Sequence, residues 1–224
     1  MYSRWLYYTA LGDSISAGVG AYLRDGFVKA YHHKLEHHLR LPVYLHLYAQ
    51  PRITSYQLLT FLYDPNVRRD IARAHIITIN IGGNDLIQAN KRYKEIGDPQ
   101  VLEQSHYYLY NNVKQILSVI HEIKANEPQN YLIQLIGIYN PYPKLPYSDH
   151  WIGKTNESLY QLATSYKNTV YIDVYPVFQQ NGKGLFSFGG IHPNGKGHQM
   201  IADELLRSYF DYLSYLSSDQ YQQS

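Results

Sequence analysis

The sequence predicts an α/β domain: a three-layer α/β/α sandwich around a sheet of about five parallel strands. Two observations predict it. Short continuous apolar runs recur along the chain, and amphipathic helical patterns lie between them. Runs that are apolar on both faces are typical of parallel strands covered by helices. Because the 224 residues are 45% hydrophobic without a linker, repeat or compositional break, we assign residues 1–224 to one domain.

The expected strands follow one another at regular intervals, at residues 7–11, 43–47, 76–81, 131–136 and 170–174. The first helical pattern carries Phe27, Tyr31, Leu35 and Leu39 at every fourth position, and a long one keeps its apolar face from 102 to 123. An amphipathic stretch beginning near residue 195 predicts the last helix. Ligands bind such sheets at the carboxyl ends of the strands, so we expect a site there.

The first strand leads directly into Gly12, Asp13 and Ser14. Ser14 is the best candidate nucleophile, because a serine hydroxyl needs only a neighbouring base and fixed oxyanion donors to become reactive. The alternative is that Ser14 merely caps a helix. We expect Asp13 to be structural, with its carboxylate accepting hydrogen bonds from turn amides.

Two further segments supply a base and a donor. His192 precedes Pro193 near the end of the chain, where it could take the proton of Ser14 and return it to a leaving alcohol; the alternative is a helix cap. Asn84 follows a strand and two glycines, so its amide could donate to an oxyanion. The alternative is a simple turn with Asp85 as the N-cap.

These segments resemble a known family. Gly12-Asp13-Ser14-Ile15-Ser16, Gly82-Gly83-Asn84-Asp85 and His192-Pro193-Asn194 resemble, in this order, the first, third and fifth motif blocks of the SGNH or GDSL-type esterases and lipases.

The resemblance implies a flavodoxin-like SGNH-hydrolase fold and a GDSL-type carboxylic ester hydrolase that forms an acyl-enzyme on Ser14, with His192 as the general base. It implies an oxyanion hole made by the backbone N–H of Ser14, the N–H of a second-block residue and the side chain of Asn84, supported by Asp13 and Gly83. It implies a small-molecule ester as the substrate, and no metal or organic cofactor.

The chain departs from this pattern twice. Arg52 stands where the second block has a glycine. Its N–H can still donate, while its side chain either brings positive charge to an anionic substrate or turns into solvent. Gly189 stands three residues before His192, where the family has an aspartate that orients the imidazole. We expect a backbone carbonyl to take over that role, and we expect Asp173 to bond the backbone near its strand end.

These departures leave other functions open: a weakly active or non-catalytic ligand-binding protein of the same fold, or a deacetylase or thioesterase using the same site. The shape of the acyl pocket would depend on two expected loops, 91–101 and 139–151. The second is aromatic and proline-stiffened, so we expect it to form one wall of the cleft.

Composition excludes several classes of protein. The net charge is only +2 and the basic residues are scattered, so the sequence shows no basic patch that would bind nucleic acid. No run is long enough to span a membrane, and the first strand begins too early for a signal peptide, so we expect a soluble, cytoplasmic protein without membrane insertion. Cysteine is absent, which excludes thiolate chemistry.

Histidines cluster at residues 32, 33, 37 and 38, and His33 and His37 have the one-turn spacing of zinc ligands. A helical projection places these two opposite the apolar face of their helix, so we expect them to point into solvent and to hold no metal.

Overall fold

The computed structural model describes residues 4–127 and 130–222. Five parallel strands form one sheet in the order β2-β1-β3-β4-β5. They are β1 (Leu6–Gly12), β2 (Val43–Ala49), β3 (Ile76–Asn80), β4 (Leu132–Ile136) and β5 (Thr169–Ile172). The predicted parallel sheet is confirmed. β5 ends earlier than expected because Asp173 turns the chain: its Oδ1 accepts a hydrogen bond from the N–H of Tyr175 at 3.1 Å.

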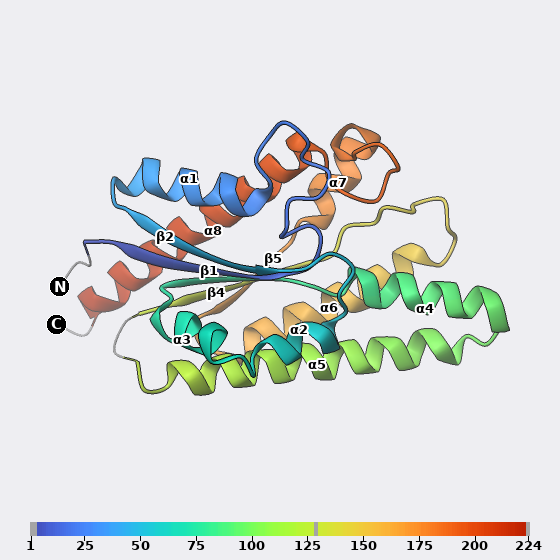
Figure 1. The fold of residues 1–224 in the computed structure, drawn as a ribbon, viewed down its shortest axis with the longest axis horizontal. Coiled ribbons are helices and arrows are strands. Elements are labelled where there is room, and N and C mark those ends of the chain that lie inside the picture. The colour runs from blue at the N-terminus through green and yellow to red at the C-terminus, as the bar shows by residue number, and fades with distance from the viewer. Residues whose placement is uncertain (1–3, 128–129, 223–224) are drawn as a thin grey trace.

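Helices cover both faces of this sheet (Figure 1). α1 (Phe27–Leu39), α7 (Tyr175–Asn181) and α8 (Gly195–Gln222) lie on one face, with a short 3-10 helix, η1 (Gly182–Leu185), after α7. The other face carries α2 (Ser55–Phe61), α3 (Pro65–Arg73), α4 (Gly83–Ile96), α5 (Gln100–Lys124) and α6 (Ser148–Ser165). The three-layer sandwich predicted from the apolar runs is therefore confirmed.

Each face of the sheet has its own apolar core. Along β1, Tyr8 and Ala10 are buried against the side of α1 and α8, whereas Leu11 is buried with residues of α5 on the other side. Side chains of a strand alternate between its two faces, so a strand covered on both sides must be apolar at nearly every position. This explains the continuous apolar runs that mark the strands in the sequence.

The strand order brings three chain segments together at one edge. β1 lies between β2 and β3, so the segments that follow these three strands all leave the sheet at its carboxyl edge. The chain winds outward in opposite directions from β1 and β3, and ligands bind at such a switch point. The expected site therefore lies where Ser14, Arg52 and Asn84 follow their strands.

One expected loop is mostly helical. Residues 91–101 belong to α4 and α5 except for a short link at 97–99. Gly97 permits this tight link because it ends α4 in the left-handed conformation, with φ of 73°. Within the described residues, no helix is long and apolar enough to cross a membrane.

Candidate active site

Ser14 lies in a turn directly after β1. Gly12 makes this turn possible, because a Cβ there would lie 2.2 Å from the hydroxyl of Ser16 and 2.6 Å from the carbonyl oxygen of Asn80. The Oγ of Ser14 lies 3.0 Å from Nε2 of His192. No helix begins here, since α1 starts only at Phe27. The geometry therefore favours a serine paired with a base over a serine that caps a helix.

His192 is held by its backbone. The carbonyl of His192 accepts a hydrogen bond from the N–H of Ser187 at 2.8 Å, which closes a hairpin-like turn. The hydroxyl of Tyr139 donates to the carbonyl of Ile191 at 2.9 Å. Asn194 caps α8, accepting hydrogen bonds from the N–H groups of Lys196 and Gly197 at 2.9 and 3.0 Å. These contacts fix the main chain on both sides of the imidazole.

The expected acceptor for the second ring nitrogen of His192 is not found. In the described part of the chain, neither a backbone carbonyl nor a carboxylate accepts a hydrogen bond from Nδ1. Gly189 occupies the turn in the left-handed region, with φ of 97°, and Asp173 bonds the backbone after β5, as we expected. With no carboxylate partner, burial alone lowers the pKa of His192 below its ordinary 6.5.

Asn84 lies in the first turn of α4. Gly82 caps this helix with φ of 113°, and a Cβ there would lie 2.7 Å from Leu109, whereas Gly83 faces open space. The Nδ2 of Asn84 donates to the carbonyl of Ile53 at 2.9 Å and to Oδ2 of Asp13 at 3.3 Å. The amide therefore links the segments that follow β1 and β2.

Asp85 is not the N-cap of α4, contrary to the alternative considered from the sequence. Its carboxylate instead accepts hydrogen bonds from the N–H of Ser55, at 3.0 and 3.2 Å, and from the hydroxyl of Ser55, at 2.6 Å. Asp85 thus joins the start of α2 to α4. Burial raises the pKa of its carboxyl group.

Asp13 is almost fully buried beside the nucleophile candidate. Its Oδ1 accepts a hydrogen bond from the N–H of Ile15 at 3.0 Å, the turn-amide contact that the sequence predicted. Burial raises its pKa from 3.8 to about 7, and the nearby charge of Asp85 contributes in the same direction.

Arg52 adopts the left-handed conformation, with φ of 70°, at the position where the resembling family has glycine. Its side chain is exposed and is not among the residues that line the apolar cavity described below, which agrees with the solvent-facing alternative. Within residues 4–127 and 130–222, neither the N–H of Arg52 nor that of Ser14 donates a hydrogen bond. Both N–H groups are therefore available to a ligand.

An apolar cavity opens beside the pair of Ser14 and His192. It is lined by neighbours of both residues and by α4, α6 and the segment after β4, including Ile15, Leu86, Ile87, Leu145, Trp151 and Ile191. The expectation that segment 139–151 forms a wall of the cleft is confirmed. The hydroxyl of Tyr147 donates to Asn90 of α4 at 2.7 Å, which ties this wall to the opposite side.

Sequence reasoning missed His198, which is fully buried in α8. Its Nδ1 accepts a hydrogen bond from the N–H of Phe27 at 3.1 Å, so its Nε2 carries the proton and donates to the carbonyl of Val19, also at 3.1 Å. His198 thereby fixes the segment after Ser14 against α8. A spacing of six residues from His192 in the sequence gave no signal for this role.

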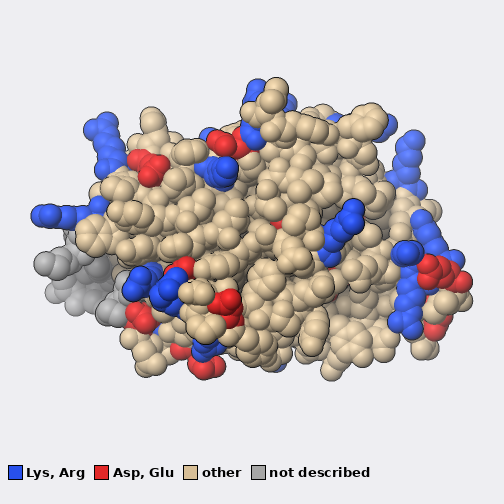
Figure 2. Space-filling view, viewed as in Figure 1, with Lys and Arg blue, Asp and Glu red and all other residues tan. Residues whose placement is uncertain are grey.

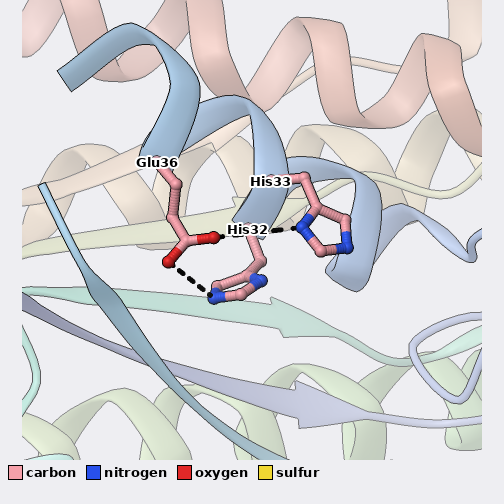
Figure 3. Close-up of side chains that lie close together, drawn as sticks. All are labelled: His32, His33 and Glu36. Carbon is pink, nitrogen blue, oxygen red and sulfur yellow. Dashed lines mark ion pairs between the residues drawn. The ribbon is translucent and has the colours of Figure 1, made fainter. Parts of the chain in front are cut away.

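Two histidines of α1, His32 and His33, form with Glu36 a group of side chains whose atoms could bind a metal ion (Figure 3). Two of these side chains already hold β2: Nε2 of His32 lies 2.7 Å from the carbonyl oxygen of Val43, and Glu36 accepts from the N–H of Val43 at 3.2 Å. His33 is exposed, as is His37, as expected. The group fits a clamp between α1 and β2 better than a metal centre.

Comparison with known proteins agrees with this geometry. Residues 10–200 match the model of the GDSL-like Lipase/Acylhydrolase family. The chain is 35% identical over 201 residues to spore germination lipase LipC of Bacillus licheniformis, covering 89% of this chain and 94% of that protein.

Solved structures show the same similarity. The lipase Lip_vut3 from a goat rumen metagenome has a TM-score of 0.85 at 34% identity, covering 90% of this chain and 96% of that one. The esterase EstA from Pseudoalteromonas sp. shares the fold, with a TM-score of 0.65 at 19% identity over 93% of this chain and 98% of its own. The chain therefore belongs to the GDSL-like lipase/acylhydrolase family and is a carboxylic ester hydrolase.

Proposed function

We propose that the protein cleaves carboxylic esters through an acyl-enzyme on Ser14, with His192 as the general base. The observation that carries this proposal is the 3.0 Å contact between Oγ of Ser14 and Nε2 of His192, together with the backbone N–H groups of Ser14 and Arg52, which donate to no acceptor among the described residues. A nucleophile in contact with its base, next to free donors, is the arrangement that acyl transfer requires.

The reaction follows from these contacts. Oγ of Ser14 attacks the ester carbonyl carbon while its proton passes to Nε2 of His192. The N–H groups of Ser14 and Arg52 and the amide of Asn84 stabilise the oxyanion. His192 then returns the proton to the leaving alcohol, and water, activated by the same imidazole, releases the acid.

The side-chain amide of Asn84 makes two hydrogen bonds of unequal length, and the longer one can be given up for the oxyanion. Its contact with Asp13 is 3.3 Å long, whereas its contact with Ile53 is 2.9 Å long. Exchanging the hydrogen bond to Asp13 for one to the oxyanion costs little free energy, and the hydrogen bond to Ile53 still holds the amide in place. The apolar cavity is lined by the neighbours of Ser14. Its apolar lining supports the proposal that it binds the acyl group of the substrate.

Ser14→Ala tests the nucleophile. We expect it to abolish hydrolysis of a short activated ester and labelling by a fluorophosphonate probe, with an unchanged melting temperature. Ser16→Ala is the matched control, because Ser16 is buried in the same turn and its hydroxyl makes no hydrogen bond within the described part of the chain. Turnover retained in Ser14→Ala would refute the mechanism, and a wild-type protein that resists the probe would favour a non-catalytic binding role.

A further inference from the structure

Two loops beside the candidate site expose large apolar side chains. Leu23 and Phe188 have exposed fractions of 104% and 99%, and that of Tyr22 is 72%. These values match side chains of an extended peptide, so the side chains of Leu23 and Phe188 contribute almost nothing to the folded core. Leaving such groups in water is unfavourable compared with burying them against an apolar partner.

The two loops lie against each other and carry the paired serine and histidine. In Figure 1, the loop after β1 and the segment after η1 lie next to each other near the carboxyl ends of the strands. Their contact is close: a Cβ added at Gly20 would lie 2.3 Å from the carbonyl oxygen of Pro193 and 2.9 Å from Cβ of His192. The exposed side chains therefore stand on two segments that contact each other and that also carry Ser14 and His192.

Basic side chains flank these apolar tips. Arg24 and Lys196 share a surface hollow with Tyr22 and Leu23. A second hollow, reached by the turn that carries Phe188, is lined by three further lysines and one acidic residue, namely Lys94, Lys144, Lys183 and Asp149.

The charged residues that line these two hollows are therefore mainly positive. The single carboxylate of the second hollow, Asp149, is engaged by hydrogen bonds from Asn140 and Tyr175 at 2.6 and 2.7 Å. Asp25, which follows Arg24, lies 3.7 Å from a ring nitrogen of His33. Figure 2 shows Lys and Arg side chains at the right-hand edge of the molecule, where the end of α4 lies in Figure 1, with Asp and Glu side chains among them.

We propose that Tyr22, Leu23 and Phe188 dock the protein on an anionic lipid surface from which it draws its ester substrate. The apolar tips enter the acyl boundary while the flanking Arg24, Lys196 and Lys183 meet anionic headgroups. Docking would place the apolar cavity and Ser14 at the lipid surface. The proposal deepens the proposed function and rests on it for the substrate, whereas the docking itself is measured without turnover.

Vesicle co-sedimentation tests the docking, in the Ser14→Ala background so that the lipid stays intact. The probes are vesicles of phosphatidylglycerol mixed with phosphatidylcholine, and vesicles of phosphatidylcholine alone. We expect binding to the anionic vesicles that weakens with added salt. Leu23→Ser with Phe188→Ser should lower the partition coefficient at least about tenfold, because two large side chains lose their burial in lipid. Tyr63→Ser should leave it unchanged, because Tyr63 is an exposed aromatic in the link between α2 and α3, on the other face of the sheet.

Arg24→Gln and Lys196→Gln should each lower binding to anionic vesicles about fivefold and leave binding to neutral vesicles unchanged. Lys167→Gln is the matched control, because Lys167 precedes β5 at the opposite end of the sheet.

Wild-type-like binding by the double serine variant would overturn the proposal. The proposal would also be overturned if the Ser14→Ala protein self-associated and the double serine variant did not, because the partner of the exposed side chains would then be a second copy of the chain. Failure of the proposed function looks different: the otherwise unmodified protein would not hydrolyse a short soluble ester, while the effects on vesicle binding would persist. In an active background, the double serine variant should hydrolyse that soluble ester at the normal rate.

Discussion

Replacing Asp13 by asparagine tests the cost of keeping a carboxyl group buried beside the nucleophile. Burial raises the pKa of Asp13 from 3.8 to about 7. The unfolded chain releases this proton near its ordinary pKa, whereas the folded protein holds it until about pH 7. The folded state therefore binds more protons between these values, and the free energy of unfolding falls as the pH rises through this window.

The size of the effect follows from the same two values. A difference from 3.8 to about 7 corresponds to about 4 kcal/mol between acid and mildly alkaline pH. Asparagine keeps an oxygen that can accept from the N–H of Ile15 but carries no charge. Asp13→Asn should therefore gain stability relative to the wild type, by up to about 4 kcal/mol, as the pH rises from 4 to 8.

Urea unfolding at a series of pH values measures this difference. Groups that do not interact with Asp13 contribute equally to both proteins, so the comparison isolates Asp13 together with its coupling to the charge of Asp85. Asp173→Asn is the matched control, because Asp173 also accepts a hydrogen bond from the N–H two residues ahead but is exposed. If the stability difference between wild type and Asp13→Asn stays constant from pH 4 to 8, the reasoning about the buried carboxyl is wrong.

Three further predictions concern the chemistry of the site. Because burial lowers the pKa of His192, the acid limb of the profile of kcat/KM against pH should have its midpoint below 6.5; a midpoint above 7 would instead indicate an unseen anionic partner. Arg52→Gly relieves the strain of the left-handed conformation and keeps the N–H, so the free energy of unfolding should change by less than about 1 kcal/mol and activity should be retained. Arg52→Pro removes the N–H and should lower kcat, measured in steady-state assays, by about a hundredfold or more. Tyr139→Phe removes the hydrogen bond to the carbonyl of Ile191 and should slow both turnover and fluorophosphonate labelling about tenfold; an unchanged labelling rate would show that this bond does not position His192.

The layers of the fold were predictable because they depend on local patterns. Strand β3, for example, is buried at every position, and its apolar run is visible without knowledge of its neighbours. Boundaries were less predictable where a single side chain turns the chain. Asp173 ends β5 by such a contact, and Gly97 joins two helices across a stretch that looked like a loop.

Within the site, the sequence identified Ser14, Asn84 and His192 but not the side chains that hold their segments in place. Ser14, Asn84 and His192 stand in recognisable contexts, whereas Tyr139 and His198 hold the site through long-range hydrogen bonds. Such a bond depends on where two distant segments meet, so neither residue has a local signature.

By itself, the sequence determined the sheet, the helices that cover it and the strand ends from which the candidate residues leave, because periodicity and turn chemistry are properties of neighbouring residues. Only the tertiary structure decided that Ser14 and His192, 178 residues apart, lie within hydrogen-bond distance, and that no carbonyl among the described residues accepts from the second nitrogen of the imidazole. It also decided that Arg52 faces solvent and that the pKa of Asp13 is raised to about 7. Burial and the direction of a side chain depend on packing between distant segments, which no local pattern records.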